Sequence, residues 1–104
     1  HHDRMFVKVK DRMVKIMFED VLWIEADRYY SWVITKDKKY LATIPLKRLS
    51  EMLPAPLFAR ASRAHLVNVK KVDEMDEYHL FIGNEKIIIG KAYKEELMKW
   101  FLKF

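Results

Sequence analysis

The sequence predicts a mainly β domain with one short central helix and one C-terminal helix. The first observation is a series of short apolar and β-branched runs that are separated by pairs of polar turn residues. The second is a change to helical spacing in residues 45–53, and the third is a helical pattern that begins at Lys91. The length of 104 residues fits a single domain, expected over residues 3–104, and 51% hydrophobic residues are enough material for its core. His1 and His2 resemble the remnant of a purification tag and are left out of functional argument.

The first half of the chain predicts a meander of about five strands. Residues 6–10 alternate between apolar and polar side chains, Asp11-Arg12 provides turn residues, and residues 13–18 resume as a mostly apolar run, which together indicate a hairpin. The later strands are bounded by the polar breaks 27–28 and 36–39. In chain order the expected strands are residues 6–10, 13–18, 21–26, 29–35 and 40–44.

The helical spacing in the middle of the chain predicts a helix of two turns. Leu46, Leu49 and Leu53 fall at positions i, i+3 and i+7, and Pro45 suits the first helical turn. Pro54-Ala55-Pro56 ends this helix, because proline lacks the backbone donor and disfavours helix in the residue before it.

The second half of the chain returns to short strands before a C-terminal helix. Ser62-Arg63 gives a polar break, Val67-Asn68 a short turn region and Gly83-Asn84 a tight turn. The expected strands are residues 57–61, 72–76, 78–82 and 85–89. From Lys91 onward one helical face carries Tyr93, Leu97, Trp100 and Phe101, with Phe104 one turn further. Met98 and Leu102 widen this stripe beyond what a surface helix needs, and core packing and contact with a partner or another protein segment both remain open.

Positive charge is concentrated in the middle of the chain. Lys and Arg together number 20 against 15 Asp and Glu, which gives a formal net charge of +5 and an isoelectric point near 9.4. Residues 36–71 hold nine Lys and Arg against only Asp37 and Glu51, a local excess of +7, so the remainder of the chain sums to −2. Such an excess favours an anionic partner, although a solvated basic face gives the same pattern.

Composition disfavours several classes of function. The chain has no cysteine, which excludes disulfides, thiolate metal sites and thiol nucleophiles and agrees with a reducing compartment. Gly83 and Gly90 are its only glycines, so a glycine-rich phosphate-binding loop cannot form. No apolar run approaches the roughly 20 residues of a membrane span, and no signal segment opens the chain. We therefore expect a soluble, cytoplasmic domain without a membrane partner.

Candidates for catalysis are few. His65 and His79 lack the spacing of a helical metal-ligand pair, and none of the serines lies in a nucleophile elbow. Glu25, inside an apolar run, is the one carboxylate of interest, and we interpret it as a buried or edge carboxylate that is bonded to the backbone or paired with Arg28. Neither an enzyme activity nor a metal or cofactor is expected.

Basic residues interleaved with turns suit nucleic-acid binding, which can take two forms. A single-strand binder presents stacking aromatic side chains on an exposed sheet face, and Tyr29, Tyr30, Trp32 and Tyr40 are available for this. A duplex reader projects Arg, Lys or His from loops into a groove. Residue spacing alone leaves both forms open.

Five segments occur in an informative order along nearly the whole chain. They are Lys15-Ile16-x-x-Glu19-Asp20-Val21-Leu22-Trp23-Ile24-Glu25-Ala26 with Asp27-Arg28-x-Tyr30, Leu46-Lys47-x-Leu49-x-x-x-Leu53-Pro54, Phe58-x-Arg60, Val67-Asn68 and Tyr93-Lys94-x-x-Leu97. In this order and spacing the chain resembles the LytTR-type DNA-binding domain. The resemblance implies an elongated stack of small antiparallel sheets with short helices. Such a domain is usually the C-terminal output half of a bacterial response regulator.

The resemblance also implies a partner and contact residues. Domains of this type bind duplex DNA at paired repeats, with loops that enter successive major grooves. Carried over by position, the residues that would reach bases are Tyr30, Ser31, Arg63 and Lys91. The residues that would contact phosphates are Arg60, Ser62, His65, Lys70 and Lys71. For His65 a second interpretation is a half-buried replacement for an aromatic residue, and Trp23 and Trp32 are expected to pack in the core and on the sheet.

The chain departs from the family pattern where function is expected. The family commonly has Arg-x-His-Arg-Ser-aromatic, whereas this chain has Arg60-Ala61-Ser62-Arg63-Ala64-His65, and Lys91 replaces the usual arginine. Lysine cannot form the bidentate contact that arginine makes with guanine, and the loss of serine at position 64 removes a hydroxyl. Altered specificity or weaker binding is therefore expected rather than a new activity.

These observations predict sequence-specific duplex DNA binding as the output of a transcriptional regulator in a two-component system. An N-terminal receiver or sensor domain and a dimer on DNA are expected with it. The alternative is a diverged module that keeps the fold and binds protein through its Trp100, Phe101 and Phe104 end, with weak or no DNA binding.

Overall fold

The computed structural model describes residues 2–104, which form ten strands, two α-helices and three short 3₁₀ turns in this part of the chain. The strands are β1 (Arg4–Val9), β2 (Arg12–Met17), β3 (Val21–Asp27), β4 (Tyr30–Thr35), β5 (Lys39–Ala42), β6 (Phe58–Ser62), β7 (His65–Asn68), β8 (Glu74–Met75), β9 (His79–Ile82) and β10 (Glu85–Ile88). The helical segments are η1 (Phe18–Asp20), α1 (Leu46–Met52), η2 (Val69–Lys71), η3 (Lys91–Tyr93) and α2 (Lys94–Met98). The tag interpretation concerns His1, which lies outside the described residues, and His2, which is exposed.

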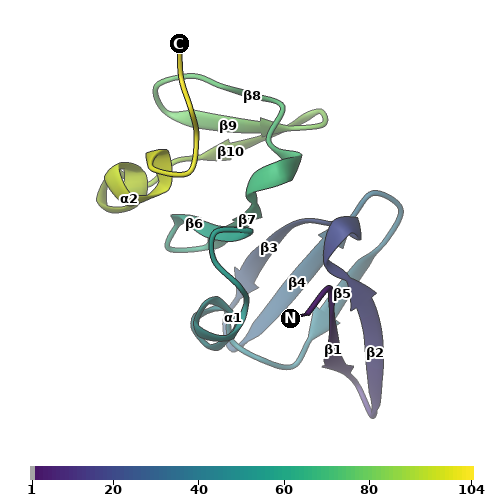
Figure 1. The fold of residues 1–104 in the computed structure, drawn as a ribbon. Helices are drawn as coiled ribbons and strands as arrows, with labels where there is room; N and C mark the ends of the chain where they lie inside the picture. Colours follow the sequence, from purple (N-terminus) through teal and green to yellow (C-terminus); the bar gives the residue numbers. More distant parts are fainter. Residues whose placement is uncertain (1) are drawn as a thin grey trace.

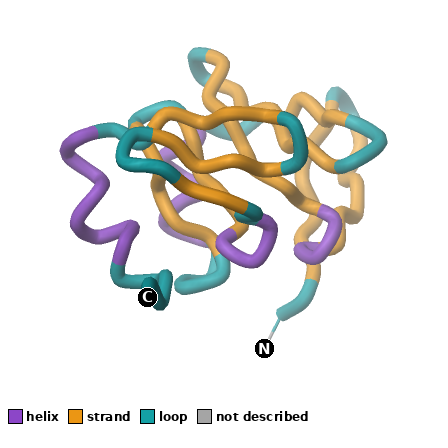
Figure 2. The backbone as a smooth tube through the Cα atoms, turned by 90° about the horizontal axis from the view of Figure 1, so that it is seen from above, coloured by secondary structure: helices purple, strands orange, loops and turns teal. Residues whose placement is uncertain are grey.

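The strands form three antiparallel sheets that are stacked along the long axis of the molecule (Figure 1). A central sheet has the order β5-β4-β3-β7-β6, the hairpin β1-β2 lies at one end of the stack, and the sheet β10-β9-β8 lies at the other. The overall extents are 45 × 27 × 25 Å, which confirms the predicted elongated shape. The helical segment that leads to the C-terminus lies beside the stacked strands (Figure 2). The predicted five-strand meander is wrong in one respect, because the first hairpin forms a sheet of its own.

Two hydrophobic cores cover the two faces of the central sheet. Because successive side chains of a strand point to opposite faces, Trp23 and Ile24 enter different cores, as do Val67 and Leu66. Ile24 and Leu66 pack with the first hairpin and α1, whereas Trp23 and Val67 pack with the third sheet and α2. A central sheet that is buried on both faces explains why its strands read as nearly continuous apolar runs.

The segment predicted as a turn at Val67-Asn68 is instead the end of β7, a strand in the interior of the central sheet. Asn68 is 1% exposed, and its side-chain amide donates to the carbonyl oxygens of Phe18 (3.2 Å) and Val21 (2.8 Å). Its side-chain oxygen accepts from the amide of Lys70 at 3.1 Å. The Asn68 side chain therefore links the end of β7 to η1, β3 and η2 by hydrogen bonds. The chain then turns through η2, which shortens the predicted strand 72–76 to β8.

The C-terminal helix is shorter than the apolar periodicity predicts. Helix α2 ends at Met98, and the residues after Trp100 leave the helical path. Leu97 is buried and Phe101 packs against the same core, whereas Trp100 is 39% and Leu102 91% exposed. The predicted single helical face is therefore wrong beyond α2, because only part of the apolar stripe has a packing surface. Among residues 2–104, no helix is long and apolar enough to cross a membrane.

Candidate nucleic-acid interface

The turns of the central sheet gather at two opposite ends. Because β3 is antiparallel to both β4 and β7, the β3–β4 turn and the β6–β7 turn lie at the same end. We call this the arginine end, which comprises Arg28, Lys47, Arg60, Arg63 and Lys91. The lysine end lies beyond the other termini of the same strands and comprises Lys36, Lys38, Lys70 and Lys71. With a rise of about 3.3 Å per residue, the seven-residue strand β3 separates the two ends by roughly 20 Å.

A groove runs between α1 and the two turns at the arginine end. Its volume is about 570 Å³, and its lining includes four cationic side chains but only one carboxylate, that of Glu51. The cationic side chains come from three separate parts of the chain and are those of Arg28, Lys47, Arg60 and Arg63. Several donors along one groove, with little negative charge between them, suit the phosphates of a nucleic-acid backbone.

Arg28 is one of the groove residues that the sequence did not single out as a contact. It occupies the first position of the two-residue β3–β4 turn with a φ of 58°, in the left-handed region. A side chain with a Cβ costs roughly 1–2 kcal/mol there relative to glycine. This turn therefore carries a cation into the groove at a position where glycine is the less strained residue.

Arg60 is the most constrained cation of the groove. It lies on β6, is half-buried, and places its guanidinium carbon 5.9 Å from the ring centroid of Tyr93. Within residues 2–104 its Nε is buried and has no hydrogen-bond partner. A buried donor without an acceptor is costly. Because Arg60 also lines the groove, it remains a candidate for the phosphate contact that the sequence predicts.

The β6–β7 turn presents Arg63 on an exposed loop of two residues. Arg63 is exposed at the turn, whereas Ser62 and His65 form the pair of residues that closes it. Ser62 Oγ lies 2.9 Å from His65 Nδ1, and both side chains are half-buried. Burial lowers the pKa of His65 below its ordinary value of 6.5, and the nearby Glu25 carboxylate opposes this in part. Ser62 and His65 thus hydrogen-bond to each other within the fold.

Tyr30 and Ser31 have opposite environments although they are neighbours on β4. The Tyr30 side chain is 46% exposed next to the β3–β4 turn and remains available for contact. Ser31 is fully buried, and its hydroxyl donates to the carbonyl oxygen of Ile44 at 2.7 Å. The structure therefore removes Ser31 from the candidate base contacts, because alternation along β4 turns its side chain into the core.

Lys91 is brought to the arginine end by the backbone of Gly90. The Gly90 amide donates to the carbonyl oxygen of Ala61 at 2.7 Å, next to the β6–β7 turn. A Cβ built on Gly90 would lie 3.3 Å from Ser62 Cα and 3.2 Å from Tyr93 Cδ2, which is closer than nine in ten real Cβ contacts. Glycine permits this close approach, and the exposed Lys91 follows it directly.

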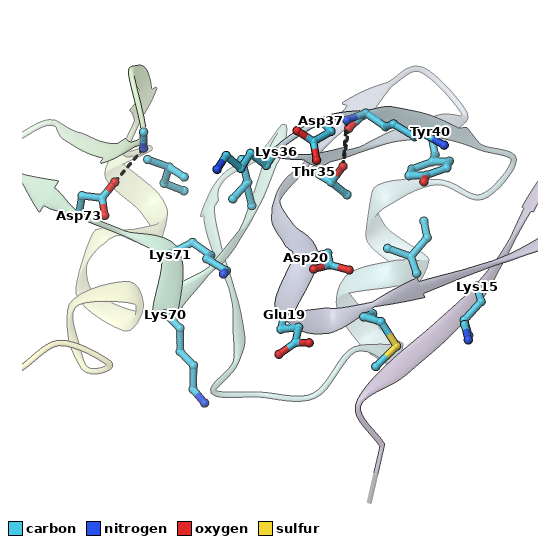
Figure 3. A pocket seen from close by; sticks show the side chains of 16 residues that line it. Lys15, Glu19, Asp20, Thr35, Lys36, Asp37, Tyr40, Lys70, Lys71 and Asp73 are labelled. Atoms are coloured by element: carbon cyan, nitrogen blue, oxygen red, sulfur yellow. Dashed lines mark hydrogen bonds between the residues drawn. The ribbon is translucent and has the colours of Figure 1, made fainter.

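Lys70 and Lys71 lie at the lysine end and do not join Arg60 and Arg63. They line a separate cavity of about 820 Å³ between the central sheet and the third sheet, together with Lys36 and Lys38 (Figure 3). Four carboxylates share this cavity, those of Glu19, Asp20, Asp37 and Asp73. The continuous basic segment of the sequence is therefore divided between two ends, and its charge is largely balanced at one of them.

The carboxylate of Glu25 has a structural partner. It accepts from the indole nitrogen of Trp23 at 2.7 Å, so the predicted pairing with the backbone or with Arg28 is wrong. Among the residues that the structure describes, no group of three or more His, Asp and Glu side chains is arranged to hold a metal ion. The arrangement at the arginine end offers hydrogen-bond donors and positive charge.

An elongated stack of small antiparallel sheets with cationic turns gathered at one end defines a β-type nucleic-acid-binding domain. The chain belongs to the LytTR family, because the model of the LytTr DNA-binding domain matches residues 11–102. The predicted family is thereby confirmed.

Curated relatives and a solved structure agree with this assignment. The chain is 29% identical over 66 residues to the heme-containing CO-sensing transcriptional regulator RcoM 2 of Paraburkholderia xenovorans (strain LB400), and 26% identical to RcoM 1 of the same strain. Each match covers 64% of this chain but only 25% of the relative, so the chain spans about a quarter of the length of these proteins.

The fold is similar to that of the LytTr DNA-binding domain of a Bacillus cereus protein described as a methyl-accepting/DNA response regulator. The TM-score is 0.79 at 20% sequence identity, over 96% of this chain and 97% of the other. The predicted mainly β fold with its short helices is confirmed.

Proposed function

We propose that residues 3–104 act as a single domain that binds duplex DNA sequence-specifically through the arginine end. The observation that carries this proposal is the groove in which four cationic side chains meet one carboxylate. It is supported by membership of a DNA-binding domain family. In this proposal the domain has no catalytic role.

The chemistry of the side chains divides their roles. Arg63 projects from a tight turn and has the planar fork that reads guanine in the major groove, while Lys91 and Tyr30 flank it with single donors. Arg60, Arg28 and Lys47 line the groove behind Arg63 and contact phosphates. Base contacts therefore come from exposed turns, and affinity comes from the groove.

We further propose that the domain is the output part of a longer bacterial transcriptional regulator in the cytoplasm. The supporting observation is that the curated relatives are regulators of about four times the matched length, and their names include a sensing function. An N-terminal receiver or sensor domain then controls binding, as in two-component systems, and two copies bind paired repeats on the duplex.

Selection from a pool of random duplexes tests this function and identifies the sequence that is bound. We expect enrichment of a defined site, bound with an affinity that falls steeply with salt. For about four to six phosphate contacts, a plot of log K against log[salt] has a slope of about −4 to −5. Absence of enrichment together with absence of duplex binding at low salt would contradict the proposal.

One observation favours a second function, that of a protein-interaction module. The C-terminal segment exposes Trp100, Leu102 and Phe104, of which Leu102 is 91% exposed. Phe101 packs against the core, so the interacting surface excludes it. Sedimentation at increasing concentration separates the two functions: association that is abolished by Trp100→Asp, in a protein that binds no duplex, supports the interaction module.

A further inference from the structure

The β6–β7 turn that presents Arg63 is held by side chains rather than by its backbone conformation alone. Strand register pairs Ser62 with His65, so the loop contains only Arg63 and Ala64. Neither loop residue has a positive φ, whereas two-residue hairpin turns that match strand twist best place at least one residue there. The strand register also shifts between Arg60 and Ser62, and further hydrogen bonds hold this turn.

Ser62 and Ala64 supply these bonds. Ser62 Oγ accepts from the Ala64 amide at 3.2 Å, and the Ala64 carbonyl accepts from the Ala26 amide on β3 at 2.9 Å. Ser62 Oγ also lies 2.9 Å from His65 Nδ1, and the hydroxyl donates to this nitrogen when the neutral ring carries its proton on Nε2. A hydroxyl that accepts from an amide and donates to an imidazole has a fixed orientation.

The environment of His65 favours the neutral ring, in which Nδ1 is able to accept. His65 lies directly opposite Glu25 of β3, whose carboxylate is engaged by the Trp23 indole. Burial outweighs that carboxylate and lowers the pKa of His65, so the ring is neutral at pH 7.5. The other ionisable groups on the turn and on the elements packed against β6 and β7 are Asp27, Lys47, Arg48, Glu51, Arg60, Arg63, Glu85, Lys86, Lys91, Tyr93, Lys94, Glu95 and Glu96.

We propose that Ser62 and His65 are positioning residues whose mutual hydrogen bond sets the orientation of Arg63, and thereby the sequence preference of the domain, without contact to DNA. The proposal rests on the proposed function. It assigns these residues a different role from the phosphate contacts expected from the family resemblance. It also links selectivity to the neutral imidazole, because a protonated Nδ1 must donate and the Ser62 hydroxyl then loses its acceptor.

The experiment measures the ratio of the affinity for the selected duplex to that for a random duplex, at constant salt. At pH 7.5 we expect Ser62→Ala and His65→Phe each to lower this ratio about fivefold, the effect of one lost hydrogen bond. The affinity for random duplex and its salt slope stay unchanged, because no phosphate contact is removed. Circular dichroism and thermal unfolding establish that each variant is folded.

Two conservative variants provide rescue. Ser62→Thr keeps the hydroxyl, and His65→Asn keeps an acceptor at the position of Nδ1, so both are expected to keep the ratio within about twofold of wild type. Between pH 7.5 and pH 5 the ratio falls for wild type and stays constant for His65→Asn. A role in packing alone would not produce this difference in pH dependence.

An NMR titration adds a readout that requires no DNA. The Ala64 amide shift should follow the protonation of His65 in wild type and should not move over the same pH range in His65→Asn. Equal losses of affinity for selected and random duplexes in Ser62→Ala would show direct phosphate contact and overturn the proposal, as would an unchanged ratio. A wild-type domain that selects no sequence overturns the proposed function and this proposal together, whereas selection with an unchanged ratio overturns this proposal alone.

Discussion

The arginine end and the lysine end of the central sheet carry similar numbers of cations but differ in what surrounds them. At the arginine end, four cationic side chains line a groove with one carboxylate. At the lysine end, the cavity between the sheets is lined by five lysines and four carboxylates. Local balance of charge, rather than the number of basic residues, therefore distinguishes a surface that attracts a polyanion from one that is nearly neutral.

The two ends also differ in the chemistry of their cations. Arg28, Arg60 and Arg63 present planar forks, and Arg60 is further held against the Tyr93 ring. The lysines of the other end are flexible point charges. Three of them are exposed, and the fourth, Lys71, is half-buried. Forked donors give directional contacts to phosphates and to guanine, whereas lysines give mainly charge. This difference supports the proposal that DNA binds at the arginine end.

The largest effect is expected at Asn68, the structural residue beside the lysine end. Asn68→Ala removes one acceptor and two donors that serve buried backbone groups, and it should lower the free energy of unfolding by about 2–4 kcal/mol. Urea denaturation measures this loss, with Asn84→Ala in an exposed turn as a control of near-zero effect. Below its unfolding transition, Asn68→Ala should bind selected DNA normally, and loss of selectivity in the folded variant would contradict the division between the ends.

The next effect concerns Arg63 at the arginine end. Arg63→Ala should reduce discrimination between selected and random duplex by about 1–3 kcal/mol, because a bidentate base contact is lost. Fluorescence anisotropy with the two duplexes measures this difference. Arg48→Ala is the matched control: Arg48 is an exposed arginine of α1 that does not line the groove, so discrimination should not change. Equal discrimination by wild type and Arg63→Ala would exclude readout by this residue.

Substitution of Arg28 by glycine is expected to change stability and DNA affinity in opposite directions. Arg28→Gly relieves a left-handed conformation and should raise the free energy of unfolding by up to about 1 kcal/mol. The same variant loses a groove cation and should bind every duplex more weakly, with a salt slope reduced by about one. Thermal unfolding and binding at several salt concentrations check both effects. An increase in stability without any loss of affinity would remove Arg28 from the interface.

The smallest effect is a pH dependence of stability. Because burial lowers the pKa of His65, the unfolded chain binds a proton more readily than the folded domain. The stability linked to the neutral ring is fully present above pH 6.5 and is lost as the pH falls through the lowered pKa. Denaturation of wild type and His65→Asn between pH 7.5 and pH 5 should show the decline only in wild type. The pKa of Asp76 is also lowered, mainly because its carboxylate accepts from the Tyr78 amide. Protonation of Asp76 affects stability only below pH 3.8, which is outside this range.

Much of the fold follows from local patterns in the sequence. The hairpins and α1 were predictable because alternation, turn residues and the Leu46–Leu49–Leu53 spacing all indicate the same elements. The strand β7 was not predictable, because asparagine is a residue typical of turns. The hydrogen bonds that place Asn68 in the sheet join it to Phe18 and Val21, about 50 positions away in the sequence. Likewise, the apolar periodicity continues beyond Met98 although the helix ends there.

The candidate interface was predictable only in part. Arg60, Arg63 and Lys91 were identified by position within the family pattern, and the structure places all three at the arginine end. Arg28 carried a signal, since a charged residue in a two-residue turn must project outward, whereas the groove position of Lys47 depends on how α1 packs. The separation of Lys70 and Lys71 from Arg60 depends on the direction of β7, and the charge sum of residues 36–71 contains no such information.

The most direct test of the central claim compares two double variants of equal chemistry. Lys47→Gln/Lys91→Gln removes two lysines at the arginine end, and Lys70→Gln/Lys71→Gln removes two at the lysine end. We expect the salt slope of duplex binding to fall in magnitude by about one for the first variant, in which Lys47 is the proposed phosphate contact, and to remain that of wild type for the second. A slope that is reduced by the Lys70→Gln/Lys71→Gln variant and unchanged by Lys47→Gln/Lys91→Gln would place DNA at the lysine end and contradict the account.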